Sequence, residues 1–100
     1  MRDEQALEKE IQDKGLNAPR LTPAHIDAQI TGEAYYVFQG TTLTVCALTL
    51  RNGFHVVGES AAASPSNFDV EIGRKIARDN ARAKIWALEG YLLRSKLAAA

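Results

Sequence analysis

The sequence predicts one α+β domain, in which a three-stranded antiparallel β-meander is followed by a long C-terminal helix and preceded by short helices. Three observations predict this fold class. Aromatic and β-branched residues gather between residues 35 and 61, the pair Asn52-Gly53 interrupts them, and residues 69–97 are rich in helix formers. One hundred residues suffice for a single core. We divide the chain into an N-terminal helix and linker, residues 1–21, and one α+β domain, residues 22–100.

The first helix is expected over residues 3–14, where charges are dense and Leu7 and Ile11 stand four positions apart. Gly15 then acts as a stop signal. Two large apolar residues make only a narrow apolar stripe, so this helix is expected to be marginally stable on its own. It needs packing against another surface or remains mobile.

A second short helix is expected to begin at Thr22. Threonine is a good N-cap, and Pro23 suits the first helical position because its φ is already helical. Ile26 and Ile30 repeat on one face, and Gly32 is expected to end the helix.

Three strands are expected next, at Tyr35–Phe38, Thr42–Arg51 and Phe54–Ala61. The second strand has apolar residues on both faces, which indicates a central strand. Asn52-Gly53 predicts a two-residue hairpin turn in which both residues take positive φ. These features together predict the antiparallel meander.

The last helix is expected to begin near Phe68 or Asp69. At 100° per residue, four apolar residues fall within about 60° of one another and predict the core-facing stripe. These four residues are Ile72, Ile76, Ala83 and Ala87. The arginines at 74, 78 and 82 then lie on the opposite, solvated side.

This helix is too long for a compact domain. From 69 to 97 it would measure about 43 Å, whereas a compact chain of this length has a radius of gyration of about 13 Å. Either the helix breaks at Gly90, or its C-terminal part packs against another subunit. Because this part is apolar on every side, we expect a homo-oligomer. The expected interface residues are Ile85, Trp86, Leu88, Tyr91, Leu92 and Leu93.

Composition restricts the function. Twelve basic and twelve acidic side chains cancel and the pI is about 6.7, which makes nucleic acid an unlikely partner. No apolar run is long enough to span a membrane, and a single cysteine, Cys46, is typical of a reducing cytoplasm. No catalytic motif, metal-ligand spacing or cofactor motif is present. We therefore expect a cytoplasmic protein that is not an enzyme and needs no metal or cofactor.

A small anionic ligand is the expected binding partner. Residues 69–100 hold seven basic and four acidic groups, and arginine forks suit phosphates. Phe68 offers a ring for stacking, although it also suits a hydrophobic staple at the helix start. Asn80 and Arg82 lie far apart around the helix, so a pocket that uses both is expected between subunits. The candidate ligand-binding residues are Asn67, Phe68, Arg74, Arg78, Asn80, Arg82 and Arg94.

Four strings add a family resemblance: TTLTVC (41–46), LRNGFHVVGESA (50–61), NFDVEIGRKIARDNA (67–81) and KIWALEGYLL (84–93). They resemble the gene-49-like or gene-66-like family of small tailed-phage proteins, over about residues 33–97. The expected architecture is similar to that of the Thoeris anti-defence sponges. That resemblance implies an oligomer that sequesters a cyclic ADP-ribose signal, or cyclic oligonucleotides, without cleaving it. The alternatives are a phage factor that binds nucleic acid, or one that binds a host protein through the C-terminal helix.

Overall fold

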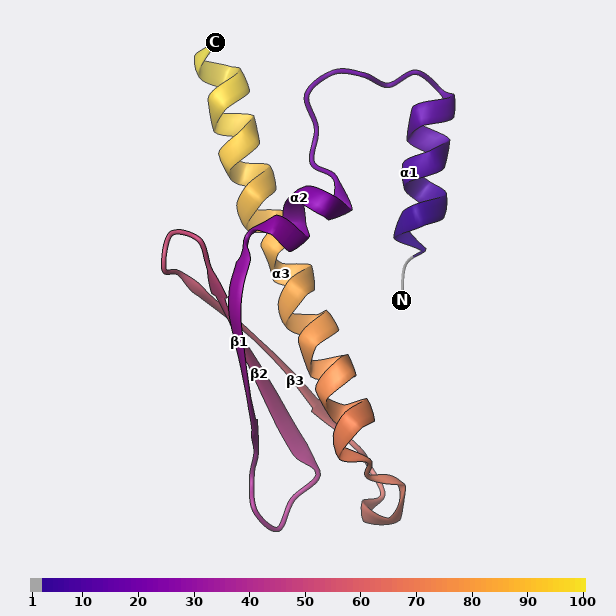
Figure 1. Ribbon diagram of the computed structural model, residues 1–100, viewed down its shortest axis with the longest axis vertical. Helices are drawn as coiled ribbons and strands as arrows, with labels where there is room; N and C mark the ends of the chain where they lie inside the picture. The colour runs from indigo at the N-terminus through magenta and orange to yellow at the C-terminus, as the bar shows by residue number, and fades with distance from the viewer. Residues whose placement is uncertain (1–2) are drawn as a thin grey trace.

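The computed structural model, which describes residues 3–100, confirms the α+β fold (Figure 1). Two short helices come first, α1 (Glu4–Asp13) and α2 (Pro23–Ala28). The strands β1 (Ile30–Val37), β2 (Leu43–Leu50) and β3 (His55–Ala61) follow. A short 3-10 turn, η1 (Pro65–Asn67), leads into the long helix α3 (Val70–Ala99).

The strands form one antiparallel sheet in the order β1-β2-β3, as the sequence predicts. The first strand begins earlier than expected, because α2 ends at Ala28 and Ile30–Ala34 already pairs with β2. Gly32 therefore lies inside a strand, opposite Thr49, and does not end a helix. The β-branched residues Ile30 and Thr31 favour the extended conformation there.

The hairpin between β2 and β3 differs from the predicted two-residue turn. Gly53 has a φ of +87°, but no residue other than glycine takes positive φ in the described chain, so Asn52 does not. Gly53 N–H donates to Leu50 O, and Leu50 N–H donates to Phe54 O. Residues 51–53 thus form a three-residue loop, in which only the glycine occupies the left-handed region.

The core lies between α3 and the sheet face that Cys46, Leu48 and Val56 present. From α3 it receives Gly73, Ala77, Ala81 and Ile85. The predicted stripe is wrong: Ile72 is 57% exposed and Ile76 is 45% exposed, and Ala83 and Ala87 are exposed too.

The reason for this difference is a close backbone contact at Gly58 of β3. A Cβ atom placed on Gly58 would lie 2.8 Å from Ala81 Cα and would also meet the Ala77 carbonyl oxygen. Only small residues permit a helix to approach a sheet so closely. The face of α3 with glycine and alanine therefore packs on the sheet, and the larger isoleucines remain outside.

The molecule is elongated, with extents of 52 × 31 × 18 Å and a Cα radius of gyration of 16.3 Å. The 30-residue α3 continues unbroken through Gly90, so the predicted break does not occur. Figure 1 shows the C-terminal end of α3 extending past the sheet and α1 standing apart on the other side of α3. None of the α1 residues is buried. No helix among residues 3–100 is long and apolar enough to cross a membrane.

Candidate functional site

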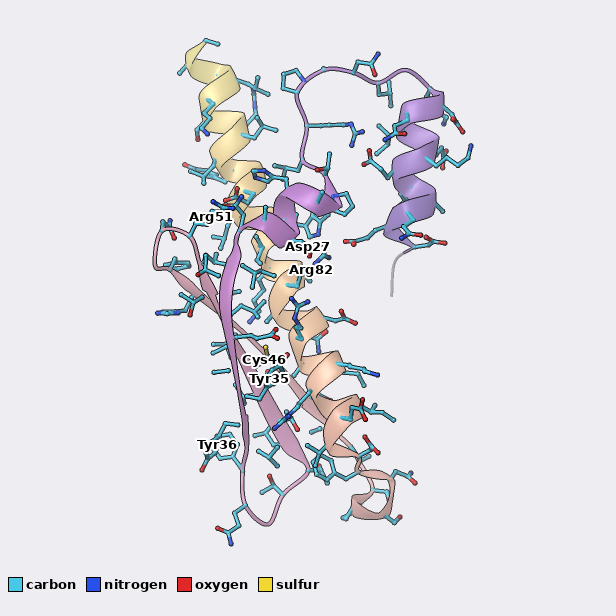
Figure 2. All side chains as sticks on the ribbon, in the orientation of Figure 1. Asp27, Tyr35, Tyr36, Cys46, Arg51 and Arg82 are labelled. Atoms are coloured by element: carbon cyan, nitrogen blue, oxygen red, sulfur yellow. The ribbon has the colours of Figure 1, made fainter. Side chains whose placement is uncertain are left out.

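Arg82 of α3 has the most elaborate polar surroundings of the predicted ligand-binding residues. Its Nε donates to Asp27 Oδ1 at 2.7 Å, and its Nη1 donates to Glu4 Oε2 at 2.7 Å. Its side chain is only 13% exposed. The hydrogen bond with Glu4, followed by the contact with Asp27, raises the pKa of Arg82, although burial opposes this shift. Figure 2 shows Arg82 beside Asp27 where α2 meets α3.

One turn earlier on α3, Arg78 is also paired. Its Nε donates to Glu33 Oε2 of β1 at 2.6 Å, and this hydrogen bond holds the pKa of Glu33 below its usual value. Tyr35 donates to the same carboxylate oxygen at 3.2 Å. Burial is the main reason that the pKa of Tyr35 rises to about 12. The Arg74 guanidinium lies 5.3 Å from the centre of the Tyr35 ring, in a cation–π contact.

The arginine stripe is therefore not the solvated basic face that the sequence predicts. Acidic residues on α1, α2 and β1 pair with Arg78 and Arg82, and these lie 45 to 78 positions away in the chain. In the described chain, Arg74 has a cation–π contact but no carboxylate partner. Helical periodicity reports only which side of α3 the arginines occupy. It contains no information about the carboxylates that other elements bring to that side.

A cavity of about 620 Å³ lies between α1 and α3. Its apolar lining includes Leu7 of α1, with Ala83 and Trp86 of α3. Asn80 and Arg82 both contribute to its polar lining. The expectation that these two residues cannot share a pocket within one chain is wrong. They flank the same outward face of α3, and α1 supplies the opposite wall.

The remaining predicted ligand residues do not converge on this cavity. Phe68 is half-buried beside Gly73 at the start of α3. Gly73 occupies the position where a hydrophobic staple needs an apolar side chain, so the staple does not form. Asn67 ends η1 and is exposed. Arg94 is exposed near the far end of α3.

Asn80, which does line the cavity, also donates from Nδ2 to Glu59 O of β3 at 2.8 Å. This hydrogen bond explains why an asparagine stands in the middle of a helix.

The six residues predicted to form a subunit interface, between Ile85 and Leu93, range from fully buried to exposed. Ile85 is fully buried in the chain's own core and is not available to a partner. Trp86 and Leu93 are half-buried. Three residues remain open to solvent: Leu88, Tyr91 and Leu92, of which Tyr91 is 77% exposed.

Sequence reasoning missed three residues of the site: Glu4, Asp27 and Trp86 as a cavity residue. The acidic character of residues 1–20 is the one signal for Glu4, because a charged helix with a weak apolar stripe needs an oppositely charged surface. In residues 3–100, no three His, Cys, Asp or Glu side chains come close enough to hold a metal ion.

The fold and the site define a small α+β protein with a largely buried, ion-paired arginine beside an open cleft. A family model matches residues 21–97, and the chain belongs to the phage protein (N4 Gp49/phage Sf6 gene 66) family. The match begins earlier than the resemblance noted in the sequence, because it includes α2 and all of β1. No curated protein and no solved structure matches the chain significantly.

Proposed function

We propose that this phage protein binds and sequesters a cyclic nucleotide immune signal, of the cyclic ADP-ribose class, without cleaving it. The cleft between α1 and α3 is the proposed binding site, and Arg82 is the residue that grips phosphate. The family membership supports a phage role, and the resemblance to the Thoeris anti-defence sponges supports the ligand class.

The observation that carries this proposal is the position of the Glu4 carboxylate on Arg82. Carboxylate and phosphate oxygens accept the same N–H bonds of a guanidinium, so Glu4 occupies a place that a phosphate group can take. Since α1 buries no residue, little packing holds Glu4 there. A ligand phosphate can displace it, while Asp27 keeps the guanidinium oriented from its Nε side.

The size and lining of the cleft agree with a nucleotide. Small-molecule pockets measure about 300–1,000 Å³ and combine apolar walls with a few polar groups. Here Trp86 supplies an aromatic wall and Asn80 an amide near Arg82. Stacking on an aromatic ring contributes about 1–3 kcal/mol per base, and a charge-assisted hydrogen bond about 1.5–3 kcal/mol. The other predicted ligand residues lie outside this site: Asn67, Phe68, Arg74, Arg78 and Arg94.

We also propose that the exposed end of α3 packs against a second copy. Leu88, Tyr91 and Leu92 form an apolar surface beyond the sheet that the chain's own elements leave open. If a host protein covers this surface instead, the purified chain is a monomer in light scattering. A dimer or larger species supports the homo-oligomer.

A nucleic-acid ligand is less well supported. Arg78 and Arg82 already have carboxylate partners, which reduces the positive charge available to a long polyanion. Binding that weakens steeply with salt would favour this alternative over a small ligand.

The test is a thermal-shift screen with cyclic ADP-ribose isomers, cyclic dinucleotides and cyclic trinucleotides. A ligand at 100 times its Kd adds about 2.7 kcal/mol to the stability of the folded state. After heat denaturation, chromatography should recover the bound ligand intact. A cleaved product, or no stabilisation by any of these ligands, contradicts the proposal.

Two variants test the site itself. Arg82→Ala should lower affinity about 10- to 150-fold, which corresponds to the loss of 1.5–3 kcal/mol. Glu4→Gln should raise affinity, because it removes the competing carboxylate, and a purely structural role would not produce this gain. Lys75→Ala is the control, since Lys75 is an exposed cation of α3 away from the cleft. Equal losses in Arg82→Ala and Lys75→Ala would argue against the cleft.

A further inference from the structure

The two edge strands, β1 and β3, differ in whether their outward-facing backbone groups have hydrogen-bond partners. On β3, the carbonyl oxygens of Val57 and Glu59 point away from the sheet and are both occupied. Lys84 Nζ donates to Val57 O at 2.5 Å, and Asn80 Nδ2 donates to Glu59 O at 2.8 Å. Side chains of α3 therefore block the β3 edge against another strand.

The β1 edge is open. Phe38 N–H donates to Leu43 O, so in the antiparallel ladder Tyr36 and Ala34 also direct their backbone groups toward β2. The N–H and C=O groups of Glu33, Tyr35 and Val37 then point outward. Within residues 3–100, no hydrogen bond to these outward backbone groups is present. Figure 1 shows β1 on the side of the sheet away from α1, with neither α1 nor α3 along its outer edge.

Beyond the bulge between Ile30 and Gly32, β1 has little of the usual protection of an edge strand. Proteins commonly place lysine or proline on exposed edges, and the sequence ITGEAYYV contains neither. Its one charge, Glu33, is turned toward Arg78. Tyr36 is 59% exposed, and its ring packs edge-on against Phe38 with centroids 4.7 Å apart. Figure 2 shows Tyr36 projecting away from α3. This is an edge suited to strand addition.

We propose that β1 pairs antiparallel with β1 of a second copy, around a two-fold axis at Tyr35, to give a six-stranded sheet. Tyr35 lies opposite Tyr35 of the other copy, and Glu33 lies opposite Val37. Ala34 lies opposite Tyr36 in a non-hydrogen-bonded pair, where the two Cα atoms are closest. A small side chain therefore faces a large one at this position. No two charged side chains of β1 itself face each other. This self-complementarity favours a second copy over an unrelated extended segment.

The proposed junction gathers charges of both signs on the face that packs against α3. Arg74 stacks on Tyr35, at the two-fold axis, and no carboxylate lies within ion-pair distance of it in the described chain. The pairing therefore places the Arg74 guanidinium groups of both copies on either side of the axis. Glu33 of each copy lies two residues from Tyr35 on the same face and is already paired with Arg78 of its own copy.

The surface area of the chain leaves room for this interface. The chain exposes 7187 Å², whereas a compact monomer of its mass exposes about 5,600 Å², an excess of roughly 1,600 Å². A standard interface buries about 800 Å² per partner. The excess is about twice that amount, and both α1, which buries no residue, and the projecting end of α3 contribute to it.

The test is cross-linking in register. Ala34→Cys chains mixed with Tyr36→Cys chains should form covalent dimers under mild oxidation, because the proposed pair brings these positions within disulfide reach. Either variant alone should form few covalent dimers, because in the proposed register the two copies of the same cysteine do not lie opposite each other. Val57→Cys mixed with Glu59→Cys, on the blocked edge, is the control. No dimer in the first mixture, or equal amounts in the unmixed samples, overturns the proposal.

Light scattering provides a second measurement. Tyr36→Lys should reduce the number of associated copies about twofold, because it places a charge on the paired edge. Val57→Lys makes the same change on the same sheet face at the blocked edge and should leave the mass unchanged. Equal masses for Tyr36→Lys and the unmodified chain overturn the proposal. Neither variant touches the nucleotide cleft, so ligand binding succeeds or fails independently of this pairing.

Discussion

The two halves of α3 both contain large apolar side chains but differ in which residues they bury. From Val70 to Ile85, glycine and alanine face the sheet and are buried, while the bulky Ile72 and Ile76 are exposed. From Trp86 to Ala99 no residue is fully buried, and Tyr91 and Leu92 face solvent. Side-chain size, and not hydrophobicity alone, therefore decides which face of α3 packs against the sheet. The first half serves the fold, and the second half is available for association.

The largest expected effect is at the boundary between the halves. Ile85→Ala removes a fully buried side chain and should lower the free energy of unfolding by about 2–5 kcal/mol, from lost burial and the cavity left behind. Leu92→Ala, seven residues later and half-exposed, should change it by less than about 0.5 kcal/mol in dilute solution. Urea denaturation of both variants measures the contrast. Similar losses would mean that the two halves are equally part of the core.

A smaller effect is expected where α3 touches β3. Gly58→Ala forces a methyl group against the backbone of α3 and should destabilise the fold by about 1–3 kcal/mol. Gly32→Ala is the matched control in β1, because its new Cβ would meet only Thr49, at 3.8 Å. Thermal unfolding of the two variants distinguishes them. If Gly58→Ala unfolds at the same temperature as the unmodified chain, the close helix–sheet contact is wrong.

The smallest expected effect lies in the second half of α3. Gly90→Ala should raise the stability by about 0.5–1 kcal/mol, because alanine is the better helix former. The new Cβ would make an ordinary contact with Leu21, at 3.8 Å. Circular dichroism during heating measures this gain. A loss of stability would instead indicate that α3 bends at this position, or that a neighbouring copy approaches closely there.

Local signals in the sequence were sufficient for the elements but not for their packing. Thr22 and Asp69 cap their helices as their residue types predict, and the alternation in β2 predicts the central strand. The core face of α3 could not be predicted, because it depends on Gly58 in a different element. A glycine inside a strand is the one signal in the sequence for such a contact.

For the candidate site, too, local sequence signals predicted where a residue lies on its helix but not what it contacts. The position of Arg82 on a face of α3 followed from helical spacing. Its partners Glu4 and Asp27 could not be predicted, because an ion pair between distant elements produces no periodic pattern in the sequence. The cleft depends on where α1 lies, and a helix without buried residues gives no sequence signal of its position.

The hydrogen bonds that Lys84 and Asn80 make to β3 limit how far copies of this protein can add to one another through their strands. A sheet with two open borders can recruit chains without end and grow into a filament. Here only one border is open, so the first joining event consumes it on both molecules. Growth by this route terminates at a pair, so strand pairing alone does not produce a filament.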